Sequence, residues 1–140
     1  MTDISALLAA VLLVAAAVVH VFWGVGGVWP ARDGTALAKA VVGPKQEAMP
    51  GLVACAMIAV LLCGGAAVVL ARAGIVDAGP DRLWRLGAWV VVGVLIARGA
   101  IGLATSALAR PRETYHRLDL RAYSPLCLVI AALAVPAALA

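Results

Sequence analysis

Charged side chains are scarce in this sequence. Asp, Glu, Lys and Arg make up 13% of the 140 residues, whereas a soluble domain carries about 25%. Hydrophobic residues make up 65%, and the mean hydropathy is +1.07. The composition therefore excludes an ordinary soluble domain and indicates a membrane protein. The net charge of +4 does not indicate a nucleic-acid partner, because the basic residues lie in short loops between apolar runs.

The sequence also lacks the usual patterns of cofactor and metal sites. Cys55, Cys63 and Cys127 lie in apolar segments without CxxC spacing, so we interpret them as small hydrophobic residues. No glycine-rich phosphate loop, zinc-ligand spacing or nucleophile elbow is present. Haem ligation by His20 and His116 would require the loop around His116 to fold inward by about 13 Å. We therefore expect no metal and no cofactor.

Four long apolar runs are present instead. They predict transmembrane spans over residues 4–29, 49–71, 83–109 and 123–139. The helix length of each run is judged against a bilayer core about 30 Å thick. The first run follows Asp3, contains no Lys or Arg, and is not followed by a cleavage site and a polar domain, so we interpret it as a retained helix. The fourth run is short, so either its helix begins earlier, near Leu118, or the bilayer thins around it. The sequence predicts an all-α protein, a single four-helix transmembrane bundle over residues 1–140.

The basic residues predict an orientation. The two loops after the first and third spans contain seven of them, and the other side of the membrane contains three. Because cytoplasmic loops are enriched in Lys and Arg, we expect these two loops in the cytoplasm and both termini outside. The seven are Arg32, Lys39, Lys45, Arg110, Arg112, Arg117 and Arg121, and the three are Arg72, Arg82 and Arg85. Residues 35–42, in the first of these loops, are mildly amphipathic and are expected on the membrane surface.

Arg98 interrupts the third span. An arginine at a helix centre costs about 2.5–3.5 kcal/mol to insert, and each Leu, Ile or Val returns about 0.3–0.6 kcal/mol. The surrounding apolar residues outweigh that cost, so Arg98 is expected inside the membrane with a partner. Glu47 is the favoured counter-charge, and Glu113 and Asp119 are the alternatives.

His20 lies in the first span near small and aromatic residues. His20, Trp23, Gly24 and Gly27 have the spacing of one helix face, and Pro30 is expected to end that helix. His20 lies about 13 Å and Arg98 about 16 Å from helix ends on the same side of the membrane. We therefore predict one polar pocket that contains both. In the alternative interpretation, Arg98 extends to the interface or bonds backbone carbonyls, and His20 is an ordinary core histidine.

A second polar group precedes the fourth span. In a helix, Asp119 would follow His116 at i+3, and Tyr123 would follow Asp119 at i+4, so the three side chains would share one face. Such a group suits either proton transfer or a hydrogen-bonded buttress, and we favour the buttress. Ser124 and Pro125 have the residue types of a helix N-cap and first turn.

Two runs resemble a known family. Residues 20–27, HVFWGVGG, and residues 116–128, HRLDLRAYSPLCL, are similar to small bacterial four-span membrane proteins catalogued as domain of unknown function three-nine-nine-five. The resemblance covers nearly the whole chain. It implies four helices in a bacterial inner membrane, and it supplies neither an activity nor catalytic residues.

These observations lead to three functional hypotheses. The first is binding of a small amphipathic or anionic molecule, such as a lipid, isoprenoid or quinone-like compound. Arg98 and His20 would provide polar contacts, Trp23 an aromatic wall, and Glu47 a nearby charge. The second is a structural accessory subunit of a larger membrane complex. The third is an intramembrane acid–base enzyme that uses His20 or the His116–Asp119 pair.

Overall fold

The computed structural model describes residues 2–77, 79–109 and 113–140, and within these ranges it contains helices and loops but no strand. The helical elements are α1 (Thr2–Gly24), α2 (Gly34–Val41), α3 (Leu52–Arg72), α4 (Asp81–Leu108), α5 (Thr114–Leu118), the π-helix η1 (Asp119–Tyr123) and α6 (Ser124–Leu139). Four helical stretches are long and apolar enough to cross a membrane: α1, α3, α4 and the continuous stretch Thr114–Leu139. The all-α, four-span prediction is confirmed.

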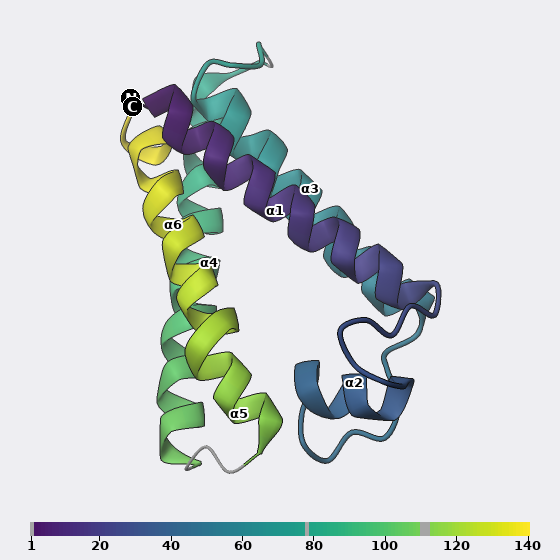
Figure 1. Cartoon of the computed structure of the whole chain (residues 1–140). Coiled ribbons are helices and arrows are strands. Elements are labelled where there is room, and N and C mark those ends of the chain that lie inside the picture. Colours follow the sequence, from purple (N-terminus) through teal and green to yellow (C-terminus); the bar gives the residue numbers. More distant parts are fainter. Residues whose placement is uncertain (1, 78, 110–112) are drawn as a thin grey trace.

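The four spans form two pairs. Helix α1 lies beside α3 and α4 lies beside α6, and the pairs meet near the chain termini and diverge toward α2, as Figure 1 shows. The core where they meet is built largely from small side chains, which let helices approach closely without a water-driven apolar collapse. Its buried members are Ala6, Ala9, Ala10, Leu13, Ala66, Val69, Ala88, Val92, Ile130, Ala134, Ala137 and Ala138. These residues belong to the half of each helix nearest the termini, so the opposite half is free to hold polar groups.

Helix α2 lies at the diverging end of the two pairs (Figure 1). Asp33 caps it, because its Oδ1 accepts a hydrogen bond from the backbone N–H of Ala36 at 2.8 Å. The hydroxyl of Tyr123 donates to the carbonyl oxygen of Ala40 at 3.3 Å and so joins α2 to the start of the fourth span.

Helix α1 ends earlier than predicted. It ends at Gly24, because Gly26 has a positive φ of 97°. The N–H of Gly27 donates to the carbonyl of Phe22 at 2.9 Å and that of Gly26 to the carbonyl of Trp23 at 3.1 Å, which is the Schellman arrangement. Gly26, and not Pro30, therefore ends the helix, and Gly27 lies outside the predicted helix face.

The fourth span begins earlier than residue 123. α5, η1 and α6 follow one another without a break from Thr114, which agrees with the alternative of an earlier start. Ser124 is not an N-cap: it has helical φ and ψ, and its N–H donates to the carbonyl of Asp119 across a π turn. Pro125 follows directly, and since proline has no N–H and crowds the preceding turn, it favours a widened turn here.

Candidate functional site

The polar site is centred on an ion pair between α4 and η1. Arg98 Nη2 lies 2.9 Å from Asp119 Oδ1. The side chain of Asp119 is fully buried, while that of Arg98 is 42% exposed. The counter-charge is therefore Asp119, one of the two alternatives, and the prediction of Glu47 is wrong. Glu47 is exposed, and its backbone carbonyl accepts a hydrogen bond from the Thr35 hydroxyl at 3.0 Å.

Two buried serines also donate hydrogen bonds to the Asp119 carboxylate. The Ser124 hydroxyl donates to Oδ1 at 3.0 Å, and the Ser106 hydroxyl donates to Oδ2 at 2.8 Å. Arg98 Nη1 also donates to the Ser124 hydroxyl at 3.3 Å. Both carboxylate oxygens thus accept hydrogen bonds, which buried polar groups require.

The local helix geometry explains why these residues meet. Arg98, Gly102 and Ser106 are spaced i, i+4 and i+8 and so share one face of α4. Asp119 and Ser124 are five residues apart, and the π turn, with its i to i+5 hydrogen bond, brings them to the same side of the helix. Single π turns inside helices occur frequently at functional sites.

Gly102 provides the space for the cluster. A Cβ atom built on it would collide with Ser124 Oγ and Arg98 Nη1 and would lie 2.8 Å from Asp119 Oδ2. Gly99, one turn earlier, is close to Leu128 and to the carbonyl of Ser124. The two glycines therefore let α6 and its polar groups lie directly against α4.

The cluster extends to the loop through His116. The Ser106 hydroxyl hydrogen is directed at Asp119, so His116 Nδ1, at 3.2 Å, donates to the Ser106 oxygen. His116 Nε2 lies 3.6 Å from Glu113 Oε2, whose side chain is 56% exposed. Of the predicted trio, His116 and Asp119 are joined through Ser106, while Tyr123 is directed to α2.

Sequence reasoning missed the contacts of both serines with Asp119: it left out Ser106, and it predicted Ser124 only as a helix N-cap. Serine is neutral in hydropathy, so Ser106 and Ser124 do not interrupt an apolar run as Arg98 does. The signal that could have identified Ser106 is its spacing from Arg98 on the face of α4.

His20 lies in a different place, on α1. Its Nδ1 lies 2.8 Å from the carbonyl oxygen of Ala16, and its ring centroid lies 5.5 Å from that of Trp23. A cavity of about 160 Å³ adjoins the ring, between α1, α2 and α3. Its lining includes His20, Trp23, Val41, Met49, Cys55 and Ile58, and Arg98 does not contribute to it. The structure therefore places His20 and Arg98 in two separate sites.

The described residues contain no group of three or more His, Cys, Asp and Glu side chains that could hold a metal ion. Cys55, Cys63 and Cys127 are free thiols.

Comparison with known proteins gives one result. The family model described as "Protein of unknown function (DUF3995)" matches residues 13–134, a range that contains both sites. No curated protein and no solved structure matches the chain.

Proposed function

The chain belongs to the DUF3995 family of proteins of unknown function, and we propose, from the geometry of Arg98, that it binds a small amphipathic molecule inside the membrane through a carbonyl group. The observation that carries the proposal is the unequal burial of the ion pair. Asp119 is fully enclosed, yet the Arg98 side chain remains 42% exposed. Part of the Arg98 side chain is therefore not covered by Asp119 and can contact a bound molecule.

Arg98 has hydrogen-bond donors to spare. Its guanidinium group carries more N–H donors than the contacts to Asp119 and Ser124 use. Arg98 lies about 15 Å along α4 from Leu108, at a rise of about 1.5 Å per residue, and so at membrane depth. Lipid tails cannot accept hydrogen bonds, so an acceptor on a bound molecule would stabilise these N–H groups.

The charge of the cluster indicates which acceptor suits it. Asp119 already neutralises Arg98, so a second full negative charge would gain little and would face the buried carboxylate. A neutral carbonyl oxygen accepts the free N–H groups without that repulsion. This narrows the candidates to carbonyl-bearing amphiphiles, such as quinones, isoprenoid ketones or lipid esters.

Asp119 is a positioning group in this proposal. Three donors already occupy its two oxygens, namely Arg98, Ser106 and Ser124. These donors use three of the about four lone-pair positions of the carboxylate, and its side chain is fully buried, which together argue against Asp119 as a general base. Its effect is to hold the guanidinium plane in one orientation.

Binding of decylubiquinone to the purified protein in detergent tests the proposal. Arg98→Gln should weaken binding about tenfold to a hundredfold, because a charge-assisted hydrogen bond contributes about 1.5–3 kcal/mol. Arg98→Lys keeps the charge beside Asp119 but loses the planar fork, so it should fold and bind with an intermediate affinity. The matched control is Arg72→Gln, which removes an arginine paired with Asp81 at the other end of the molecule.

Two results would contradict this function. Equal affinity of the Arg98→Lys, Arg98→Gln and Arg72→Gln proteins for decylubiquinone would remove Arg98 from the site. Tighter binding of decanoate, an anion of similar chain length, would reject the preference for a neutral carbonyl.

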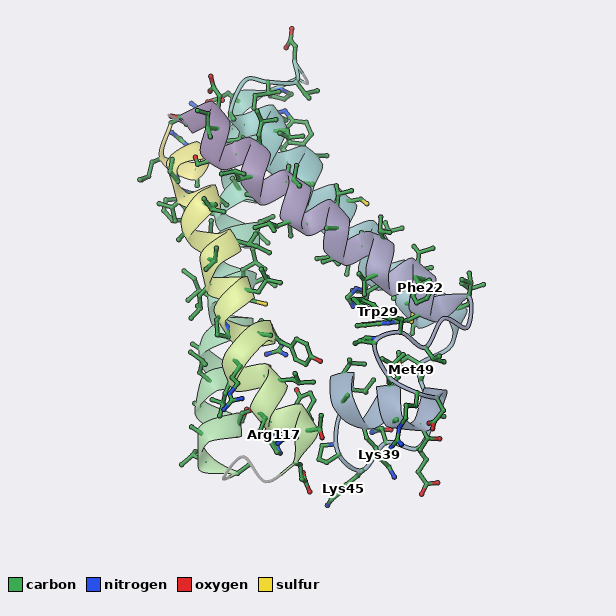
Figure 2. All side chains as sticks on the ribbon, in the orientation of Figure 1. Phe22, Trp29, Lys39, Lys45, Met49 and Arg117 are labelled. Atoms are coloured by element: carbon green, nitrogen blue, oxygen red, sulfur yellow. The ribbon has the colours of Figure 1, made fainter. Side chains whose placement is uncertain are left out.

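The proposal includes an orientation in the plasma membrane of a bacterium. The two loops with seven basic residues are placed in the cytoplasm, and both termini are placed outside. Arg110 and Arg112, two of those seven, lie outside the described residues. Lys39, Lys45 and Arg117 are among the others, and Figure 2 shows these three at the end of the molecule away from the termini.

Cysteine labelling in intact cells tests the orientation. In a background without the three native cysteines, Asp77→Cys should react with a membrane-impermeant maleimide added outside, because Asp77 is exposed in the opposite loop. Lys45→Cys, also exposed, should react only after the cells are opened. Labelling of Lys45→Cys in intact cells would reverse the orientation.

A further inference from the structure

The cavity beside His20 contains one polar atom without a partner. The Ala16 carbonyl can only accept a hydrogen bond, so His20 Nδ1 carries the hydrogen that joins them. In the neutral imidazole ring the other nitrogen, Nε2, is then an acceptor. Among the residues that the structure describes, Nε2 has no hydrogen-bond partner.

The two other side-chain hydrogen-bond donors of the lining, on Trp23 and Cys55, already have acceptors. The Trp23 indole N–H donates to the carbonyl of Trp29 at 2.9 Å. The Cys55 thiol lies 3.5 Å from the carbonyl of Pro50 and donates to it. Neither group is free to donate into the cavity, so the lone pair of His20 is available to a donor on a bound molecule.

The size and walls of the cavity limit what that molecule can be. The cavity is open on one side, and its volume of about 160 Å³ is similar to that of an enclosed cavity of about 150 Å³ that holds benzene in an engineered protein. The His20 and Trp23 rings are inclined at 58° to each other and provide aromatic surface, and the remaining lining side chains are mostly apolar. An aromatic ring with a hydroxyl group satisfies both conditions.

The cavity lies close to the membrane surface. It is lined by residues near the end of α1, by the end of α2 and by Met49, and Figure 2 shows Trp29 and Met49 between α1 and α2. Tryptophan is enriched at this level of a membrane, where ring compounds with one polar group also partition. Phenols would thus meet the cavity at the depth where they concentrate.

The geometry points to a second binding site, independent of Arg98, in which His20 Nε2 accepts a hydrogen bond from the hydroxyl group of a phenol. The ring of the phenol fills the cavity between α1, α2 and α3. This is a site for a neutral phenolic compound and requires no charge on the ligand.

Phenol, anisole and benzene test the site in the purified wild-type protein. Phenol should bind about twofold to tenfold more tightly than the other two, because anisole has the oxygen without its hydrogen and benzene has neither. The protein has two histidines, so ¹⁵N spectra of histidine-labelled protein contain an internal control. Phenol should shift the Nε2 resonance of His20 toward the hydrogen-bonded position and leave that of His116 unchanged.

His20→Leu should reduce phenol binding to the level of benzene. Because this variant could also alter packing, the ¹⁵N measurement on the wild-type protein is decisive. Equal affinities for phenol, anisole and benzene, or an Nε2 resonance of His20 that phenol does not move, would overturn the proposal. Loss of decylubiquinone binding in the Arg98 variants would not affect this result, so the two proposals fail separately.

Discussion

Replacing Asp119 with alanine is expected to lower the free energy of unfolding by about 3–5 kcal/mol, which is the usual effect of removing one partner of a buried ion pair. The carboxylate is fully buried, and its loss leaves Arg98 without a counter-charge inside the membrane. The hydroxyl groups of Ser106 and Ser124 also lose their acceptor. Reversible unfolding in detergent measures the change.

Asp81→Ala is the matched control for this experiment. Asp81 also pairs with an arginine, Arg72, at 3.0 Å, but its side chain is 72% exposed. The Arg72 side chain is only 9% exposed, but the Asp81 carboxylate faces outward, so this variant should lose less stability than Asp119→Ala, which removes a fully buried carboxylate. An Asp119→Ala protein that unfolds like Asp81→Ala would show that the buried cluster does not hold α4 to the fourth span.

A double variant separates the charge from the packing. Arg98→Leu combined with Asp119→Leu removes both charges together, and replacing a buried pair by apolar side chains is often neutral or stabilising. The double variant should therefore recover much of the stability lost in Asp119→Ala, while its decylubiquinone binding should be as weak as that of Arg98→Gln. A double variant less stable than Asp119→Ala would mean that the serines, and not the charges, dominate the cluster.

The four spans were predictable because length and apolarity identify a membrane helix without knowledge of its neighbours. Arg98 was predictable for a related reason, since an arginine in an apolar run requires a partner. The identity of that partner was not. Glu47 directly precedes the second span on the same side of the membrane, but position along the membrane normal does not determine which helices lie side by side.

The separation of His20 from Arg98 has the same physical origin. Both residues lie in the membrane half away from the termini, where α1 and α3 diverge from α4 and α6 (Figure 1). The divergence follows from where small side chains gather: the buried alanines of the core lie near the termini, so close packing between the two helix pairs ends before either polar residue is reached. Sequence spacing shows which residues share a face of one helix, but it does not show that the two helix pairs diverge.

The π turn at Asp119 could not be derived from i, i+3 and i+4 spacing. That spacing grouped His116 with Asp119, which Ser106 links, but it also placed Tyr123 with them. The wider turn instead aligns Ser124 with Asp119, and Tyr123 contacts Ala40 in α2. Pro125 was the only residue in the sequence that indicated an irregular helix at this point.

Gly102→Ala is expected to destabilise the protein by about 1–3 kcal/mol or more, although alanine is the better helix former. The added methyl carbon would collide with Ser124 Oγ and Arg98 Nη1 and lie 2.8 Å from Asp119 Oδ2. Ser124 and Asp119 are fully buried and hydrogen-bonded to each other, so neither can move aside without breaking a contact. Each lost hydrogen bond adds about 0.5–1.5 kcal/mol to the packing cost.

Gly93→Ala, on the same helix, is the matched control and is not expected to destabilise the protein. A Cβ atom at Gly93 meets nothing within 4 Å, so the variant should be unchanged or more stable by up to about 1 kcal/mol from helix propensity. Thermal unfolding of both variants in one detergent measures the contrast, and Gly102→Ala combined with Ser124→Ala should recover part of the loss by removing one colliding atom. Equal melting temperatures for Gly102→Ala and Gly93→Ala would contradict the prediction. They would mean that Arg98, Asp119 and Ser124 are not packed against Gly102, so Arg98 would not be held in place to bind a carbonyl group.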